Sequence, residues 1–214
     1  MTVIATFSGL NIVGLPCDTM DGVSAPSSIE WTPQEKVSVT DGSFNFQEQV
    51  FDWQQSMWSG KVSFPAMNRD SQDAWSAFIL QCRGQVNAFM IGDPKAALPK
   101  GSPVGAPLVN GAAQTGFSLL TRGWSLTQYR LLLPGDFIQI GYRLYKILNP
   151  VNSDSSGHAT LAIWPNLRDL PADSTPIIAS NCKGLFRLAK SSGNGFSTNT
   201  GSYGVAALDI REAL

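Results

Sequence analysis

The strongest constraint on the fold is the alternation of apolar and polar residues in short runs that end at turn residues. Residues 131–148 show it most clearly, because Pro134 and Gly135 form a turn there and two alternating runs meet at Gly141. A period of two is typical of strands with one buried face. We predict a hairpin whose alternating positions are Ile138 and Ile140 on one side of the bend and Tyr142, Leu144 and Leu148 after it.

Similar runs follow one another after residue 107, including 118–124 and 159–167, and predict a small barrel or sandwich. Strand character continues over 175–190. The Gly/Ser/Asn-rich stretch 191–204 is expected to be a polar loop.

The first half of the chain holds three further strand candidates, 37–40, 44–54 and 61–67. The N-terminal residues are expected to form an edge strand and loop. One packed face of this region is expected to be filled by Phe44, Phe46, Val50, Phe51, Trp53 and Trp58.

Residues 68–85 have a helical period instead, and we predict one amphipathic helix there whose Trp75 and Phe78 are core anchors. Asp70 is expected to cap its start. The expected stop signal is Arg83 followed by Gly84.

A strand over 85–91 is predicted after this helix, and the composition then changes. Residues 92–107 hold four of the thirteen prolines and several glycines. Such a stretch is typical of a linker or a long surface loop.

The chain carries few charges. Charged residues make up 14% of it, against about 25% in a typical soluble domain. The cores of protein interfaces are depleted in charge in this way, and many β-proteins are also polar and weakly charged, so composition leaves both interpretations open. A net charge of −1 provides no basic field for a phosphate backbone, so bound nucleic acid is not an expected partner.

No residue pattern predicts a catalytic site, a cofactor or a metal. His158, the only histidine, lies in a turn and matches no catalytic motif. Cys17, Cys82 and Cys182 are odd in number and far apart, which argues against a disulfide framework or a zinc site and favours reduced core residues. No basic residue precedes Lys36, and no run approaches the roughly 20 apolar residues of a membrane span, so neither a secretory signal nor membrane insertion is expected.

Two segments are similar to stretches of the distal tail proteins of long-tailed bacteriophages. Residues 75–94 combine an amphipathic helix, an Arg-Gly stop and a strand that ends in Phe-x-x-x-Asp-Pro. Residues 133–168 combine a Pro-Gly-Asp turn, an Ile-x-Ile-Gly run, a polar turn and an Ile-Trp-Pro run. The residues that carry the resemblance include Trp75, Phe78, Arg83, Gly84, Pro134, Gly135, Asp136, Gly141, Tyr145, Trp164 and Pro165.

The resemblance covers roughly residues 50–190 and implies a mainly β fold. A β-sandwich hub domain with one α-helix would comprise residues 1–93 and 186–214, and an OB-like small β-barrel would be inserted at 94–185. The resemblance also implies a structural virion protein, not an enzyme, that is assembled in the host cytoplasm and located in the phage tail. It would form a homo-hexameric ring between the tail tube protein and the tail hub or tip protein, with DNA only passing through the lumen.

Two other functions stay open. Another tail-tip or baseplate hub component could reuse the same barrel. A carbohydrate-binding host-adhesion module could stack sugars on exposed aromatic rings. The candidate rings are Trp53, Trp58, Trp124 and Trp164, although core packing is the expected role of each. An enzyme such as a cell-wall hydrolase has the least support.

Overall fold

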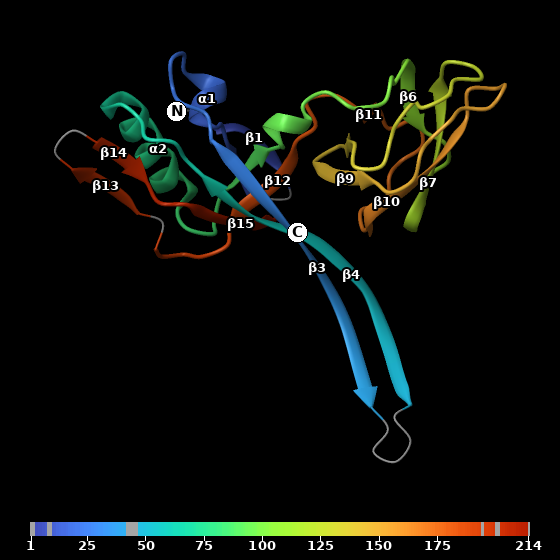
Figure 1. The fold of residues 1–214 in the computed structure, drawn as a ribbon, viewed down its shortest axis with the longest axis horizontal. Helices are drawn as coiled ribbons and strands as arrows, with labels where there is room; N and C mark the ends of the chain where they lie inside the picture. Colours follow the sequence, from blue (N-terminus) through green and yellow to red (C-terminus); the bar gives the residue numbers. More distant parts are fainter. Residues whose placement is uncertain (1–2, 8–9, 42–46, 194, 200–201, 214) are drawn as a thin grey trace. The chain divides into compact units, whose positions relative to one another are not determined.

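The computed structural model describes residues 3–7, 10–41, 47–193, 195–199 and 202–213. In these ranges the protein is mainly β, with fifteen strands and two α-helices (Figure 1). Within these ranges, neither helix has the length and apolar character needed to cross a membrane.

The chain divides into two compact units, which we describe separately. Unit 1 comprises residues 1–32, 58–95 and 183–214, and unit 2 comprises residues 33–57 and 96–182. By this division residues 33–57 belong with the barrel strands of unit 2. That residues 94–185 form an independently folding domain stays a prediction.

A seven-stranded sheet forms the framework of unit 1. Its strands, in spatial order, are β1 (Val3–Phe7), β2 (Leu10–Val13), β5 (Ala88–Ile91), β12 (Gly184–Leu188), β15 (Leu208–Glu212), β4 (Glu48–Ser63) and β3 (Ser28–Asp41). The two edge strands are therefore β1 and β3, which confirms the expected N-terminal edge strand. Both β3 and β4 are long and continue into residues assigned to unit 2, running side by side (Figure 1).

Helix α2 (Arg69–Cys82) confirms the predicted amphipathic helix. Trp75 and Phe78 are buried, with exposed fractions of 1% and 0%, and their rings meet edge to face at 5.5 Å. The predicted cap is wrong: the N-cap is Asn68, whose side chain accepts a hydrogen bond from the Ser71 N–H at 2.9 Å. Asp70 instead lies in the first turn, where the positive end of the helix dipole stabilises a carboxylate.

Three elements of unit 1 lie in segments for which no such helix or strand is predicted. Helix α1 (Pro16–Thr19) is only four residues long. The predicted polar loop 191–204 contains strands β13 (Phe196–Asn199) and β14 (Ser202–Val205), which pair with each other. Gln72 Nε2 ties this hairpin to α2 by donating to the carbonyl oxygens of Ser197 (2.7 Å) and Gly204 (3.3 Å).

A six-stranded, nearly closed, barrel-like sheet forms the body of unit 2. Its strands, in spatial order, are β11 (Ile177–Ile178), β8 (Phe137–Ile140), β9 (Arg143–Ile147), β10 (Ala159–Leu167), β7 (Gly116–Trp124) and β6 (Gly105–Val109). The two ends of the sheet approach each other, because the Val109 N–H donates to the Thr175 carbonyl (2.9 Å) and the Ser174 N–H donates to the Val109 carbonyl (3.0 Å). The predicted linker 92–107 contains a short 3-10 helix, η1 (Pro94–Ala96), and the start of β6.

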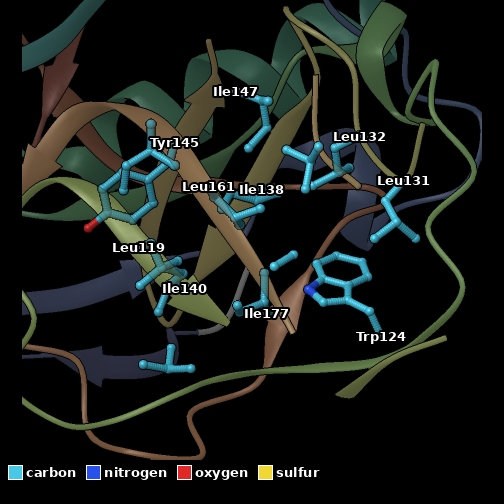
Figure 2. Close-up of a cluster of buried hydrophobic side chains, with 14 of the residues drawn as sticks. Leu119, Trp124, Leu131, Leu132, Ile138, Ile140, Tyr145, Ile147, Leu161 and Ile177 are labelled. Carbon is cyan, nitrogen blue, oxygen red and sulfur yellow. The ribbon is translucent and has the colours of Figure 1, made fainter. Parts of the chain in front are cut away.

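One cluster of buried side chains fills the barrel-like sheet, and Figure 2 shows Leu119, Ile138, Tyr145 and Leu161 among them. Ile138 and Ile140 both belong to it, as the alternation predicts. After the bend the side that joins this cluster is Tyr145 and Ile147, while Leu144 is buried outside it. Leu148 is 47% exposed, contrary to the predicted alternation, because β9 ends one residue earlier.

Candidate functional site

The most distinctive surface of unit 2 is formed by the outer parts of β3 and β4. Its exposed apolar residues, which we call the apolar ribbon, are Val37, Val39, Val50, Phe51 and Trp53. Each of these side chains is between 45% and 59% exposed. Scattered single apolar residues are ordinary on a protein surface, but five on two neighbouring strands form a patch.

The apolar side chains of the ribbon project from both of its faces. Phe51 and Trp53 are two positions apart on β4, so they share a face, and their rings meet edge to face at 4.7 Å. Trp53 Nε1 donates to Ser38 Oγ at 3.1 Å, which places Ser38 on that same face. Val37 and Val39 therefore lie on the opposite face of β3. A two-stranded ribbon of this kind has no core of its own to cover either face.

The base of the ribbon is fixed to β10 of the same unit. Ser56 Oγ donates to Asn166 Oδ1 (2.9 Å), and Asn166 N donates back to Ser56 Oγ (3.0 Å). Asn166 Nδ2 also donates to the Gln54 carbonyl at 2.7 Å. Trp164 Nε1 donates to Glu35 Oε1 at 2.7 Å. These bonds hold residues 35 and 54–56 in place and leave the apolar residues beyond them exposed.

The expected packed face of the first half is thus wrong for most of the residues that the structure describes. Trp58 is buried, at 4% exposed, whereas Val50, Phe51 and Trp53 are exposed. Phe44 and Phe46 lie outside the described residues. Among the candidate sugar-stacking rings, Trp58 and Trp124 are buried core residues, Trp53 belongs to the apolar ribbon, and Trp164 is half-buried.

The Pro-Gly-Asp turn of the predicted hairpin holds the barrel together. Asp136 is 3% exposed and accepts three backbone hydrogen bonds. Its Oδ1 accepts from Lys100 N (2.7 Å), and its Oδ2 accepts from Gly101 N (3.0 Å) and Leu133 N (2.8 Å). Gly135 adopts a φ of 97°, which a residue with a side chain rarely adopts. The turn therefore connects the start of unit 2's barrel segment to β8.

The remaining motif residues lie in turns, in the core or at the end of a helix. Gly141 turns β8 into β9 with a φ of 57°, and Tyr145 is buried in the barrel cluster. Pro165 lies in β10 and is joined to Trp164 by a cis peptide bond. In unit 1, Arg83 (φ 50°) and Gly84 (φ 65°) end α2 in the left-handed region. A Cβ on Gly84 would lie 3.2 Å from the Ser191 Cα, so the chain passes closely there.

In the part of the chain that the structure describes, the titratable groups form no evident catalytic arrangement. His158 Nδ1 lies 3.7 Å from Asp154 Oδ2, and both side chains are about half exposed at the surface. Backbone N–H groups of His158 and Ser156 hold the pKa of Asp154 below its usual range. Hydrogen bonds from the Gly111 N–H, Ser174 and Arg122 lower the pKa of Asp173. Within the described ranges, no cluster of three or more His, Cys, Asp or Glu residues could hold a metal ion.

The three cysteines are free thiols. Cys82 and Cys182 are buried, and this burial raises the pKa of each to about 12. Burial also raises the pKa of Cys17, with the neighbouring Asp18 carboxylate adding to the shift. Thiolate chemistry at neutral pH is therefore disfavoured at all three positions.

In the comparisons with known proteins, no family model and no curated protein matches the chain.

Proposed function

We propose that the chain is a structural virion protein of a long-tailed phage, forming the distal tail ring between the tail tube protein and the tail hub or tip protein. In this proposal unit 1 is a β-sandwich hub, and the barrel-like sheet of unit 2 is an OB-like domain. The single observation that carries the proposal is the apolar ribbon, whose side chains are about half exposed on both faces in the described part of the chain.

Association is the simplest way to cover this ribbon. Each of its five side chains is about half exposed, so complete burial stabilises by about 1 kcal/mol for each. Few ionic groups need to be desolvated at the same time, because only 14% of the residues are charged. The ribbon thus gains from an interface that a monomer cannot supply.

Charge favours another copy of the chain as the occupant. Residues 33–57 contain one lysine, Lys36, and four carboxylates, which gives a net charge of −3. Since the whole chain carries −1, the rest of it carries +2. The acidic segment of one copy and the remainder of the next carry opposite net charges of −3 and +2, and contacts between unlike surfaces close into rings when the rotation allows it.

The low net charge of the chain is also compatible with the proposal. No basic field is expected at a lumen through which DNA only passes, and the net charge of −1 provides none. Unit 1 offers two different strand edges, β1 and residues 28–32 of β3, as further surfaces for heterologous contact.

Electron microscopy of the purified full chain tests this function. Rings with an open lumen are expected, and a hexamer is the expected stoichiometry. Isolated globules, both alone and after mixing with tail tube and tail tip proteins, contradict the proposal. A ring found elsewhere in an assembled tail would identify another tail-tip component instead.

A further inference from the structure

A hollow of about 380 Å³ in unit 2 has no role in the ring proposal. It lies where β7 and β10 meet the turn segment 152–158, and its polar neighbours come from three separate parts of the chain. Its volume is within the range of small-molecule sites. The side chains that matter here are Asn110, Leu120, Asn152, Asp154, His158 and Thr160.

The turn segment beside the hollow is held in one shape. Gln128 and Ser153 exchange two hydrogen bonds, from Ser153 N to the Gln128 carbonyl (3.0 Å) and from Gln128 N to Ser153 Oγ (2.9 Å). Trp124 N donates to the Gly157 carbonyl at 3.1 Å. A Cβ on Gly157 would lie 2.4 Å from the Trp124 carbonyl oxygen, so only glycine fits. A pre-formed site of this kind loses little conformational entropy when a ligand binds.

Each of three side chains at the hollow uses one of its oxygen atoms to accept hydrogen bonds from neighbouring residues. Asn110 Oδ1 accepts from Arg122 Nη1 (3.1 Å), and Asn152 Oδ1 accepts from Arg130 N (2.8 Å). Asp154 Oδ1 accepts from the N–H groups of residues 156 (2.7 Å) and 158 (2.8 Å). Among the described residues, the two Asn Nδ2 groups and Asp154 Oδ2 have no hydrogen-bond partner, since His158 Nδ1 is 3.7 Å away.

We propose that this hollow binds a neutral saccharide. The two amide NH2 groups, the Asp154 carboxylate oxygen and the Thr160 hydroxyl form a mixed set of donors and acceptors. Sugar hydroxyls match such a set, because each one donates and accepts. Leu120 is 49% exposed and offers an apolar contact to the carbon face of the ring.

Anionic ligands fit the hollow less well. The ionised Asp154 carboxylate repels a phosphate or carboxylate group. The guanidinium of Arg122 does not compensate, because it already binds Asp173 Oδ2 (2.9 Å) and Ser174 Oγ (2.7 Å). The site therefore differs from an aromatic sugar platform and from a phosphate cradle.

Amide NMR of the 15N-labelled full chain tests the site. The probes are D-glucose, D-galactose, L-rhamnose and N-acetyl-D-glucosamine, each added up to 50 mM, with inorganic phosphate as the anionic comparison. At least one saccharide is expected to shift the amide signals of residues 110, 120 and 152–160, with a dissociation constant on the order of 1 mM.

Two variants separate this site from surface binding in general. Asp154→Asn keeps one oxygen for the turn and replaces the free carboxylate oxygen by NH2, so affinity should fall roughly tenfold. Asp93→Asn is the matched control, because Asp93 Oδ1 also accepts a backbone N–H at the surface, from Lys95, and Asp93 is not among the residues that line the hollow. The proposal is overturned if no saccharide shifts these signals, if Asp154→Asn binds as tightly as the wild type, or if phosphate binds more tightly. None of these results affects the ring proposal.

Discussion

Asp136 shows how one residue of the Pro-Gly-Asp turn can join two segments of the barrel. Its carboxylate accepts N–H groups from residues 100 and 101, far back in the sequence, and from residue 133 beside it. Buried N–H groups without an acceptor cost about 1–3 kcal/mol each. The residue is therefore a structural one, and its sequence motif reflects packing.

Asp136→Asn should lower the free energy of unfolding by about 1–3 kcal/mol. The favourable orientation of the amide keeps its oxygen for the N–H groups of Gly101 and Leu133, so the NH2 faces the Lys100 N–H and leaves it without an acceptor. Chemical denaturation of the two proteins measures the difference. Asp93→Asn serves as the control and should change stability by less than about 0.5 kcal/mol. Equal stability of Asp136→Asn and the wild type would show that the three bonds contribute nothing.

In unit 1, Trp75 is a single residue that joins several segments of the core. Its ring contacts Phe64 and Phe78 at centroid distances of 4.6 and 5.5 Å, and its Nε1 donates to the Ser24 carbonyl at 2.9 Å. Trp75→Ala should cost roughly 3–5 kcal/mol, because it leaves a cavity and an acceptor without its donor. The denaturation midpoint of the purified variant measures this loss. A midpoint unchanged from the wild type would place Trp75 outside the core.

At the scale of elements, sequence periodicity predicts those helices and strands whose apolar face is buried against the rest of the same chain. Trp75 and Phe78 follow a helical period and are buried, and Ile138 and Ile140 follow a strand period and are buried. The apolar ribbon has the same kind of alternation, and the sequence does not distinguish burial inside a chain from burial by a partner. The β13–β14 hairpin has strands of only four residues each, too short for periodicity to predict, and Gln72 holds it to α2 by two hydrogen bonds.

The hollow in unit 2 could not be predicted for a different reason. Asn110 is more than forty residues from Asp154 in the sequence, and pairing of β7 with β10 brings their surroundings together. The turn around His158 gave the only local signal, and it indicated a solvated loop. Tertiary pairing, rather than residue type, creates that site.

Phe51→Ser combined with Trp53→Ser tests the apolar ribbon as an element. Both side chains are more than half exposed, so their loss should change the free energy of unfolding by less than about 1 kcal/mol. Self-association should be lost, because one face of the ribbon becomes polar. Sedimentation velocity of the double variant measures this, with Leu80→Ser, an exposed leucine on α2, as the matched control. Association that survives the double variant contradicts a role for the ribbon.

At the scale of the whole molecule, the two units raise the question of independent folding. The barrel-like sheet closes on its own cluster of buried side chains, and the predicted linker 92–107 contains little regular structure before β6. We expect a fragment of residues 94–185 to fold alone and to give dispersed amide spectra. A fragment that is unfolded while the full chain is folded would show that the predicted domain boundaries are wrong.

The central claim is that the chain assembles into a ring, and mass photometry of the full-length protein tests it most directly. The ring proposal predicts a species near six times the chain mass of 23.0 kDa, either alone or after addition of the tail tube and tail tip proteins. The same measurement on the Phe51→Ser, Trp53→Ser double variant should give monomers. A wild-type protein that stays at 23.0 kDa under all of these conditions would contradict the account.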